Sequence, residues 1–297
     1  MSENEPWTVG RLLTWTTDYL RQHGAENPRL DAEVLLAFAR GCERIELYTA
    51  FTEIVDDDVR AKFRSLIKER ANGKPVAYLV EEKEFFSLPF RVTPAVLIPR
   101  PETEFLVTSA LDLLKQFEAS DRFSSVVDVG TGSGAIAIAI AVHSPSCLMT
   151  AVDISGEALE VARENAQTHR VLDRIQFVEG DLLSHFGEAS EEPRWDLIVS
   201  NPPYISEPER ASLPRDVVEH EPAVALFSGP TGLEVTERLV QQAEQQLRPG
   251  GWILLEISAL LSKEVLRIFE TSQAWENIAL DKDYSQLPRV VRAKRRS

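Results

Sequence analysis

The segment Asn201-Pro202-Pro203-Tyr204 carries residue types suited to holding a planar group that bears an amino nitrogen. The side-chain carbonyl of Asn201 and the backbone carbonyl of Pro202 could accept both hydrogen bonds of a primary amide or of an adenine amino group. The prolines fix their own φ angles, and Pro202 favours an extended Asn201, so both acceptors would be held before a substrate binds. Tyr204 offers a flat face for stacking. A rigid turn after a strand is the alternative interpretation.

The chemistry that suits this segment is methyl transfer to nitrogen. An amide or adenine nitrogen is a poor nucleophile because its lone pair is delocalised, so the reaction depends mainly on in-line placement, an effect worth several kcal/mol. No strong general base is needed, and none is evident. We therefore expect catalytic roles for Asn201, Pro202 and Tyr204, and a substrate site formed by Asn201, Pro202, Pro203 and Tyr204.

A second segment, Asp128-Val129-Gly130-Thr131-Gly132-Ser133-Gly134, is typical of a nucleotide-binding turn. It lies between an apolar strand-like run and an apolar helical run, and its glycines would let the backbone turn sharply and approach a ligand. Asp153 closes the next expected strand, where a carboxylate can accept both hydroxyls of an adenosyl ribose. The Gly-x-Gly-x-Gly spacing favours S-adenosyl-L-methionine over NAD, with a plain tight turn as the alternative. The expected cofactor-binding residues are Gly130, Thr131, Gly132, Ser133, Gly134 and Asp153.

Two further carboxylates end expected strands. Asp181 is placed to meet the adenine amino group, unless it only caps the next turn. Glu256 could be a carboxylate of the ligand site or a buried, hydrogen-bonded group, and the sequence does not decide between them. The five histidines show no paired spacing, so no metal site is expected.

Beyond residue 124, strand-like and helical runs alternate, which predicts a parallel sheet with helices on both faces. The ligand of such a sheet lies outside the carboxyl ends of its strands, where both segments point. The expected strands are 126–129, 149–152, 175–178, 197–200, 252–257, 278–280 and 290–292, and the expected helices are 135–142, 156–169, 234–247 and 260–271.

The part of the chain before residue 102 shows a different pattern of apolar residues. Apolar residues at three-four spacing predict helices over 9–23, 30–41 and 56–71, forming a small bundle. A weakly alternating stretch then suggests a hairpin-like connector, and a helix opens at Pro101. We predict three parts: an N-terminal helical domain (1–82), a connector (83–101) and a methyltransferase domain (102–297).

Composition limits the possible partners. The 297-residue chain has a net charge of −15, which disfavours nucleic acid as the main substrate because phosphate contacts need a basic surface. The acidic N-terminus lacks an apolar run, the longest apolar stretch is too short to span a bilayer, and the two cysteines lie far apart. We expect a cytoplasmic protein with reduced thiols that binds no membrane.

Several motifs together resemble the HemK-like release-factor glutamine methyltransferases, the PrmC family, over nearly the whole chain. The segment Pro99-Arg100-Pro101-Glu102-Thr103-Glu104 is the most specific of them, whereas Asn-Pro-Pro-Tyr is shared with adenine N6 methyltransferases. The other motifs are Pro75-Val76-Ala77-Tyr78-Leu79, Leu97-Ile98, Asp128 to Gly134, Ser200 to Ile205, Glu221-Pro222, Ala225-Leu226 and Gly232-Leu233.

The resemblance implies a Rossmann-like class I methyltransferase sheet and N5-methylation of the glutamine in the Gly-Gly-Gln loop of class I peptide chain release factors. It also implies that Leu182 and Asn201 contact the cofactor, with Asp153 and residues 130–134, and that the N-terminal helices dock the release factor. We expect a monomer. A ribosomal-protein glutamine and, less favoured, a nucleic-acid adenine are the alternative substrates. The chain departs from the usual glycine at Glu81, Ser87, Ser258 and Gln286, and from the usual glutamine at Leu261, which leaves docking and substrate choice open.

Overall fold

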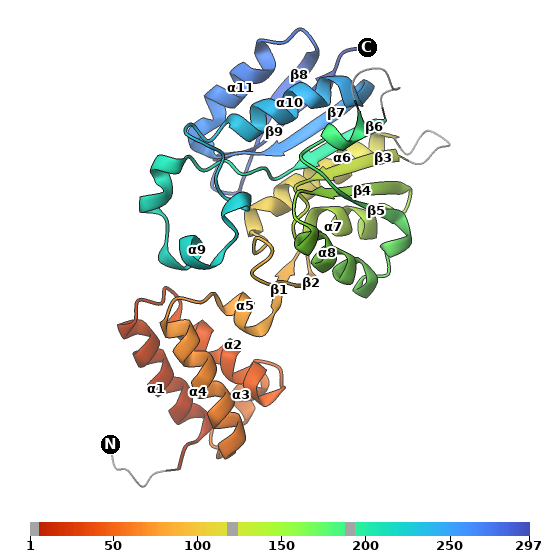
Figure 1. Ribbon diagram of the computed structural model, residues 1–297. Coiled ribbons are helices and arrows are strands. Elements are labelled where there is room, and N and C mark those ends of the chain that lie inside the picture. Colours follow the sequence, from red (N-terminus) through yellow and green to blue (C-terminus); the bar gives the residue numbers. More distant parts are fainter. Residues whose placement is uncertain (1–5, 118–123, 188–193) are drawn as a thin grey trace. The chain divides into compact units, whose positions relative to one another are not determined.

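The computed structural model describes residues 6–117, 124–187 and 194–297. The chain forms two compact units, one of Met1–Glu82 with Pro214–His220 and one of Lys83–Leu213 with Glu221–Ser297 (Figure 1). A short segment from late in the chain therefore belongs to the first unit, which local sequence patterns do not indicate. No helix within the described ranges is both long and apolar enough to cross a membrane.

The first unit is helical, as expected. Its helices pack around one apolar core that includes Leu13, Leu36 and Phe63. Thr8 caps the first helix by accepting a hydrogen bond from the backbone N–H of Arg11, and left-handed Gly41 ends the second. The elements are α1 (Val9–Gln22), α2 (Pro28–Arg40), α3 (Glu46–Thr49), α4 (Asp57–Ala71), α5 (Val76–Val80) and α9 (Arg215–His220).

The helices α3, α5 and α9 were not expected, because runs of four to six residues are too short to show a helical period. Helix α9 joins the unit through local contacts. Arg70 Nε forms an ion pair with Asp31 at 2.8 Å, and Arg70 Nη1 lies 3.9 Å from Asp216 Oδ2.

The second unit is built on a seven-stranded sheet of order β5-β4-β3-β6-β7-β9-β8. The strands β4, β3, β6 and β7 run parallel, as does β5 beside β4, whereas β9 is antiparallel to both of its neighbours. The bounds are β3 (Ser124–Val129), β4 (Cys147–Asp153), β5 (Ile175–Glu179), β6 (Trp195–Ser200), β7 (Leu247–Glu256), β8 (Trp275–Lys282) and β9 (Pro288–Arg295).

The direction of β9 corrects the expectation of an all-parallel sheet. The connection between β8 and β9 spans only residues 283–287, and a parallel pair would need a crossover of a dozen residues or more. Both strands also extend beyond the ranges 278–280 and 290–292 expected from the sequence. Most of their outer residues are exposed or only partly buried and mix polar with apolar types, so the sequence shows no clear strand pattern there.

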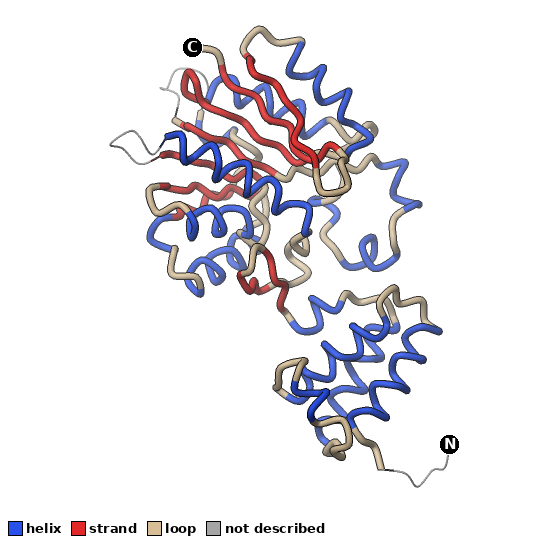
Figure 2. The backbone as a smooth tube through the Cα atoms, turned by 180° about the vertical axis from the view of Figure 1, so that it is seen from behind, coloured by secondary structure: helices blue, strands red, loops and turns tan. Residues whose placement is uncertain are grey.

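Helices cover both faces of the sheet, which makes three layers (Figures 1 and 2). One apolar cluster joins α6 and α7 to one face, and another joins α10 and α11 to the opposite face. Helix α7 is buried nearly all round, so its sequence shows no polar stripe. The bounds are α6 (Glu104–Phe117), α7 (Ala135–His143), α8 (Gly156–Thr168), α10 (Glu234–Gln246) and α11 (Ser262–Glu270).

The expected connector contains a hairpin of β1 (Glu82–Phe85) and β2 (Leu88–Arg91). Its turn residues Phe86 and Ser87 both have positive φ, at 51° and 60°, the backbone of a type I′ turn. Glu81 and Gln286 also have positive φ, at 56° and 63°. The family that the chain resembles usually has glycine at four positions, and three of them (Glu81, Ser87 and Gln286) have left-handed backbone here. This conformation costs a residue other than glycine free energy.

Candidate active site

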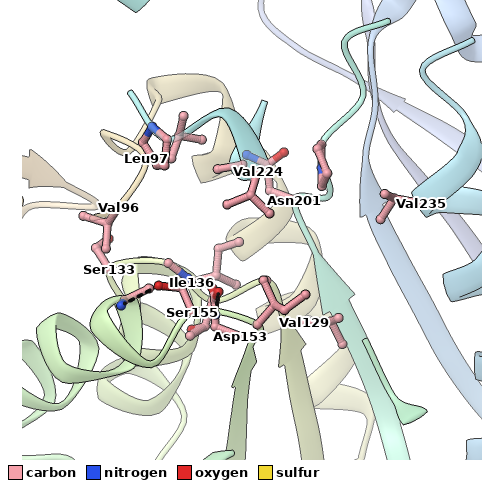
Figure 3. Close-up of a pocket in the computed structure, with 18 of the residues that line it drawn as sticks. Val96, Leu97, Val129, Ser133, Ile136, Asp153, Ser155, Asn201, Val224 and Val235 are labelled. Atoms are coloured by element: carbon pink, nitrogen blue, oxygen red, sulfur yellow. Dashed lines mark hydrogen bonds between the residues drawn. The ribbon is translucent and has the colours of Figure 1, made fainter. Parts of the chain in front are cut away.

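The crevice of the second unit lies where the strand order reverses. Strand β3 has β4 on one side and β6 on the other, so the loops after β3 and β6 diverge and leave room for a ligand. Val129 pairs in register with Ser200, and the next residues are Gly130, the first glycine of the loop, and Asn201, the first residue of the tetrapeptide. The lining comprises residues 130–133 of the glycine loop, Asp153, residues 180–182, Asn201, Pro203, Arg100, Thr103, and apolar side chains from residues 95–97 and 222–227 (Figure 3).

The three loop glycines are required for two different reasons. Gly130, Gly132 and Gly134 all have positive φ, at 73°, 55° and 80°. A Cβ on Gly130 or Gly132 would meet no atom within 4 Å, so only the backbone conformation demands glycine there. A Cβ on Gly134 would lie 2.9 Å from Ile138 Cδ1 and 3.1 Å from the Cβ of Ala162, so this glycine also allows close packing of α7 and α8.

Asp128 holds the glycine loop in place through buried hydrogen bonds. Its side chain is fully buried, and Oδ2 accepts hydrogen bonds from the Thr131 hydroxyl at 2.7 Å and from Ala137 N at 3.2 Å. Burial raises the pKa of Asp128 to about 7. This carboxyl fixes the turn and the first residues of α7 rather than facing the crevice.

Asp153 ends β4 and faces the crevice (Figure 3). Its Oδ2 accepts a hydrogen bond from Gly132 N at 2.8 Å, and its Oδ1 accepts one from Ser155 N at 3.0 Å. Each oxygen retains a lone pair, so the carboxylate is oriented by the backbone and can still accept hydroxyl groups. Burial raises its pKa, and the backbone hydrogen bonds oppose that shift.

Asp181 and Leu182 both line the crevice. Asp181 also forms an ion pair with Arg238 at 2.5 Å, in which both side chains are about half exposed. An adenine amino group would therefore share this carboxylate with Arg238. Leu182 has a φ of 55°, so the chain turns sharply there.

Asn201 marks the opposite end of the crevice. The Ser200 hydroxyl donates to Val129 O at 2.6 Å and joins the ends of β3 and β6. The Nδ2 of Asn201 donates to Thr103 Oγ1 at 3.3 Å, so Oδ1 is the acceptor that the side chain can present to a ligand. Figure 3 shows Asn201 near Val224.

Not all of the other residues of the tetrapeptide face the crevice, although all four were expected to form the substrate site. Pro203 lines the crevice with Asn201, whereas Pro202 is buried and the Tyr204 side chain does not line it. The Tyr204 hydroxyl donates to Glu256 Oε1 at 3.3 Å. The structure thus brings the four residues together at one place, and their individual roles stay predictions.

Glu256 is the buried, hydrogen-bonded group that the sequence left undecided. Only 1% of the residue is exposed, and its Oε1 accepts the hydrogen bond from the Tyr204 hydroxyl. Its other oxygen, Oε2, has no hydrogen-bond partner among the described residues. Burial raises the pKa of Glu256 to about 7, against the lowering effects of Thr103, the Arg289 charge and Tyr204.

Thr103 and Asn165 were not singled out in the sequence. Thr103 lies in the short 3₁₀ helix η1 (Pro101–Thr103), inside the motif that resembles the PrmC family, but the motif does not reveal the partner of each residue. Asn165 is buried on α8, and its Nδ2 donates to Ser133 O at 2.9 Å and to Arg91 O at 3.0 Å. A polar residue on a largely apolar helix face is the only signal that could have indicated it.

An ion pair closes the apolar side of the crevice. Arg100 contacts Glu221 Oε1 at 2.6 Å, and the Glu221 side chain is buried. This pair joins the loop before η1 to the loop that begins with Pro222. Both loops contribute apolar residues to the lining, so the pair fixes the width of the crevice at that point.

These residues fit S-adenosylmethionine. The glycine loop leaves open space where Cβ atoms would stand at Gly130 and Gly132, and Asp153 presents free acceptor positions for ribose hydroxyls. Apolar residues such as Leu97 and Val224 supply contact surface for the uncharged parts of the ligand.

The sheet order, the glycine loop and the crevice define the class I methyltransferase fold. The PrmC N-terminal domain family matches residues 11–80, and the methyltransferase small domain family matches residues 106–224. In solved structures, the fold is similar to that of the 16S rRNA N2 G1207 methyltransferase RsmC of Thermus thermophilus in complex with AdoMet and guanosine. That likeness has a TM-score of 0.51 and 21% identity, covers 72% of this chain and 50% of that one, and concerns the fold alone.

Two relatives cover nearly the whole chain. The release factor glutamine methyltransferase of Rhodopirellula baltica is 45% identical over 98% of this chain and 97% of its own length. That of Chlorobaculum tepidum is 40% identical over 97% of this chain and 98% of its own length. The chain belongs to the release factor glutamine methyltransferase family, which confirms the resemblance.

Proposed function

We propose that this protein transfers the methyl group of S-adenosylmethionine to the side-chain amide nitrogen (N5) of the glutamine in the Gly-Gly-Gln motif of class I peptide chain release factors. The observation that carries the proposal is the single crevice lined by both the glycine loop and Asn201, which follow paired residues of adjacent strands. Family membership favours glutamine over adenine as the methylated group.

The cofactor site would occupy the side of the crevice nearer β4. Asp153 would accept hydrogen bonds from the ribose hydroxyls, and the glycine loop from Gly130 to Gly134, of which residues 130–133 line the crevice, would lie against the cofactor. Asp181 and Leu182 would contact the adenine. The cofactor supplies a methyl group on a positively charged sulfur, which needs no further activation.

The substrate site would lie at Asn201. Its Oδ1 and the backbone carbonyl of Pro202 would each accept one N–H of the glutamine amide, and Pro203 would confine the amide plane. The Tyr204 ring, which does not line the crevice in this structure, would have to turn toward it to stack on the amide. With both protons engaged, the nitrogen is held in line with the methyl group, and alignment lowers the barrier. Catalytic residues would then be Asn201, Pro202 and Tyr204.

The helical unit would dock the release factor. A short stretch around α3 exposes large apolar side chains that a solvated helical bundle does not need: 71% of Ile45, 52% of Tyr48, 42% of Phe51 and 68% of Ile54 are exposed. Apolar residues gathered in this way favour a protein partner over a nucleic acid.

The direct test combines purified protein, labelled S-adenosylmethionine and a class I release factor. We expect label in the release factor, and mass spectrometry should locate one methyl group on the glutamine of its Gly-Gly-Gln peptide. A release factor with that glutamine replaced by alanine is the control. Label on a ribosomal protein or nucleic acid instead, with none on the release factor, would overturn the proposal.

A further inference from the structure

The buried side chain of Asn165 on α8 is hydrogen-bonded to two segments that are far apart in the sequence and that both lead to the crevice. Its Nδ2 donates to Ser133 O of the glycine loop at 2.9 Å and to Arg91 O of β2 at 3.0 Å, while its Oδ1 accepts from Arg91 N at 2.7 Å. A primary amide has two N–H donors and one acceptor oxygen, so a side chain rotated by half a turn would set its NH₂ group against the donor Arg91 N. The three partners therefore fix Asn165 in one orientation.

The Ser133 carbonyl needs this partner because helix α7 does not supply one. Ser133 precedes Gly134, the N-cap residue of α7, and Gly134 O accepts from Ile138 N at 2.8 Å. The N–H one residue earlier, that of Ala137, donates to Asp128 Oδ2 instead of to Ser133. Asn165 thus satisfies a buried carbonyl at the point where the glycine loop passes into the helix.

Strand β2 also depends on α8. It belongs to a two-stranded sheet, so β1 is its strand partner on one edge only. On the other edge, Asn165 bonds both backbone groups of Arg91, and His169 Nε2 donates to Pro89 O at 2.7 Å. Side chains of α8 therefore take the place of a second neighbouring strand and hold β2 in position.

Strand β2 leads directly into another part of the crevice lining. Three residues separate Arg91 from Ala95, and Ala95, Val96 and Leu97 all line the crevice. Val96 N donates to Thr93 O at 3.0 Å, so the chain between the strand and the lining forms a compact turn. The position of β2 hence determines where this apolar lining stands.

We propose that Asn165 is a positioning residue for cofactor binding: it couples β2 to the glycine loop, and so holds the apolar lining and the loop at the separation that S-adenosylmethionine requires. Figure 3 shows Val96, Leu97 and Ser133 around the same crevice, whereas Asn165 does not line it. Asn165 therefore acts through Ser133 and β2 rather than by touching the ligand. This inference rests on the proposed cofactor.

The first experiment measures cofactor affinity by calorimetric titration of Asn165→Ala and Asn165→Asp. The aspartate keeps the size of the side chain and the acceptor for Arg91 N, but it lacks the NH₂ group. In both variants the dissociation constant of S-adenosylmethionine should rise about tenfold, the equivalent of one neutral hydrogen bond. Single-turnover methylation at saturating cofactor should stay within about threefold of wild type, because the Asn201 end is unchanged. Affinity within about twofold of wild type in both variants would overturn the inference.

Gln246→Ala is the matched control. Gln246 is a buried amide whose Nε2 donates to a backbone carbonyl, that of Gly187, at 3.0 Å, and neither residue lines the crevice. Its loss should lower stability without changing cofactor affinity. An equal loss of affinity in Gln246→Ala would mean that affinity follows general stability, and would refute a specific role of Asn165.

The second experiment needs no cofactor and follows backbone hydrogen exchange. His169→Phe removes the hydrogen bond to Pro89 O and keeps a ring beside Phe90. If Asn165 couples the two segments, the loosened β2 should speed exchange about threefold or more in residues 130–136 as well as in residues 88–91. Combined with Asn165→Ala, His169→Phe should speed exchange in residues 88–91 alone, a double-mutant cycle that isolates the coupling.

The two experiments separate this inference from the proposed function. Exchange in residues 130–136 that does not respond to His169→Phe would overturn the coupling even if the protein binds S-adenosylmethionine and methylates release factors. A response that disappears with Asn165→Ala would support the coupling even if no cofactor binds, and the proposed cofactor would then be the part that fails.

Discussion

The two ends of the crevice hold their ligand-facing atoms by different means. At the glycine-loop end, backbone N–H groups of Gly132 and Ser155 orient the one carboxylate, Asp153, so the geometry is set by local turns. At the Asn201 end, the side-chain amide donates to the Thr103 hydroxyl, which belongs to a segment far away in the sequence. The geometry of the first end is therefore set locally, whereas that of the second depends on a tertiary contact.

Each end also contains a buried carboxyl whose pKa is raised to about 7 by the same cause, burial. Asp128 accepts hydrogen bonds from a hydroxyl and a backbone N–H of its own loop and helix, whereas Glu256 accepts one from the hydroxyl of Tyr204, a residue of the proposed substrate segment. We therefore expect titration of Asp128 to affect stability alone, and titration of Glu256 to affect the placement of Tyr204 as well.

The largest expected effect is at the Asn201 end. Asn201→Ala removes the acceptor for the substrate amide, and kcat/KM should fall about 100-fold to 1000-fold, comparable to loss of one oriented hydrogen-bonding group in other active sites. Single-turnover methylation measures the effect, and circular dichroism should show an intact fold. Near-normal turnover would mean that Asn201 is not at the reacting end.

At the glycine-loop end, Asp153→Ala should act mainly on cofactor affinity. Loss of a charged acceptor costs about 1.5–3 kcal/mol, so the dissociation constant of S-adenosylmethionine should rise roughly tenfold to a hundredfold. Calorimetric titration measures it, with Asp153→Asn as the milder comparison. A rate loss at saturating cofactor as large as that of Asn201→Ala would erase the distinction between the two ends.

Asp128→Asn should change the pH dependence of stability. The pKa of Asp128 is about 7 in the folded protein against 3.8 when unperturbed, so the folded state binds the proton more tightly. The stabilisation this provides is complete below the unfolded value and is lost as the pH rises through about 7. Asparagine should flatten the unfolding free energy over this window by about 1–3 kcal/mol, measured by urea denaturation.

The smallest effects are expected away from the crevice. Ser87→Gly and Gln286→Gly place glycine where φ is 60° and 63°, and each should stabilise the protein by about 0.5–1 kcal/mol. Thermal denaturation measures the gain, and methylation rates should not change. Lys83→Gly, in strand β1 and without positive φ, should instead destabilise.

The sequence predicted those parts of the molecule whose determinants are neighbours along the chain. The glycine loop, Asp153 and the tetrapeptide each follow an apolar strand, and the parallel order of the sheet brings them together. The sequence could not predict the bond between Asn201 and Thr103 or the role of Asn165, because each depends on positions far apart in the chain.

The antiparallel direction of β9 was not predicted, although its determinant lies in one short stretch of the sequence. The short connection at residues 283–287 was available in the sequence, but alternation of strands and helices outweighed it. Gln286, the left-handed residue in that turn, was identified only as a departure from glycine.

The assignment of α9 to the helical unit has a practical consequence for dissecting the protein. The backbone passes between the two units at three peptide bonds, after residues 82, 213 and 220. A fragment ending at residue 82 would lack α9, and Arg70 would lose its neighbour Asp216. Proteolytic nicking after residue 82 should leave two pieces that co-purify, so the helices are better probed by substitution than by deletion.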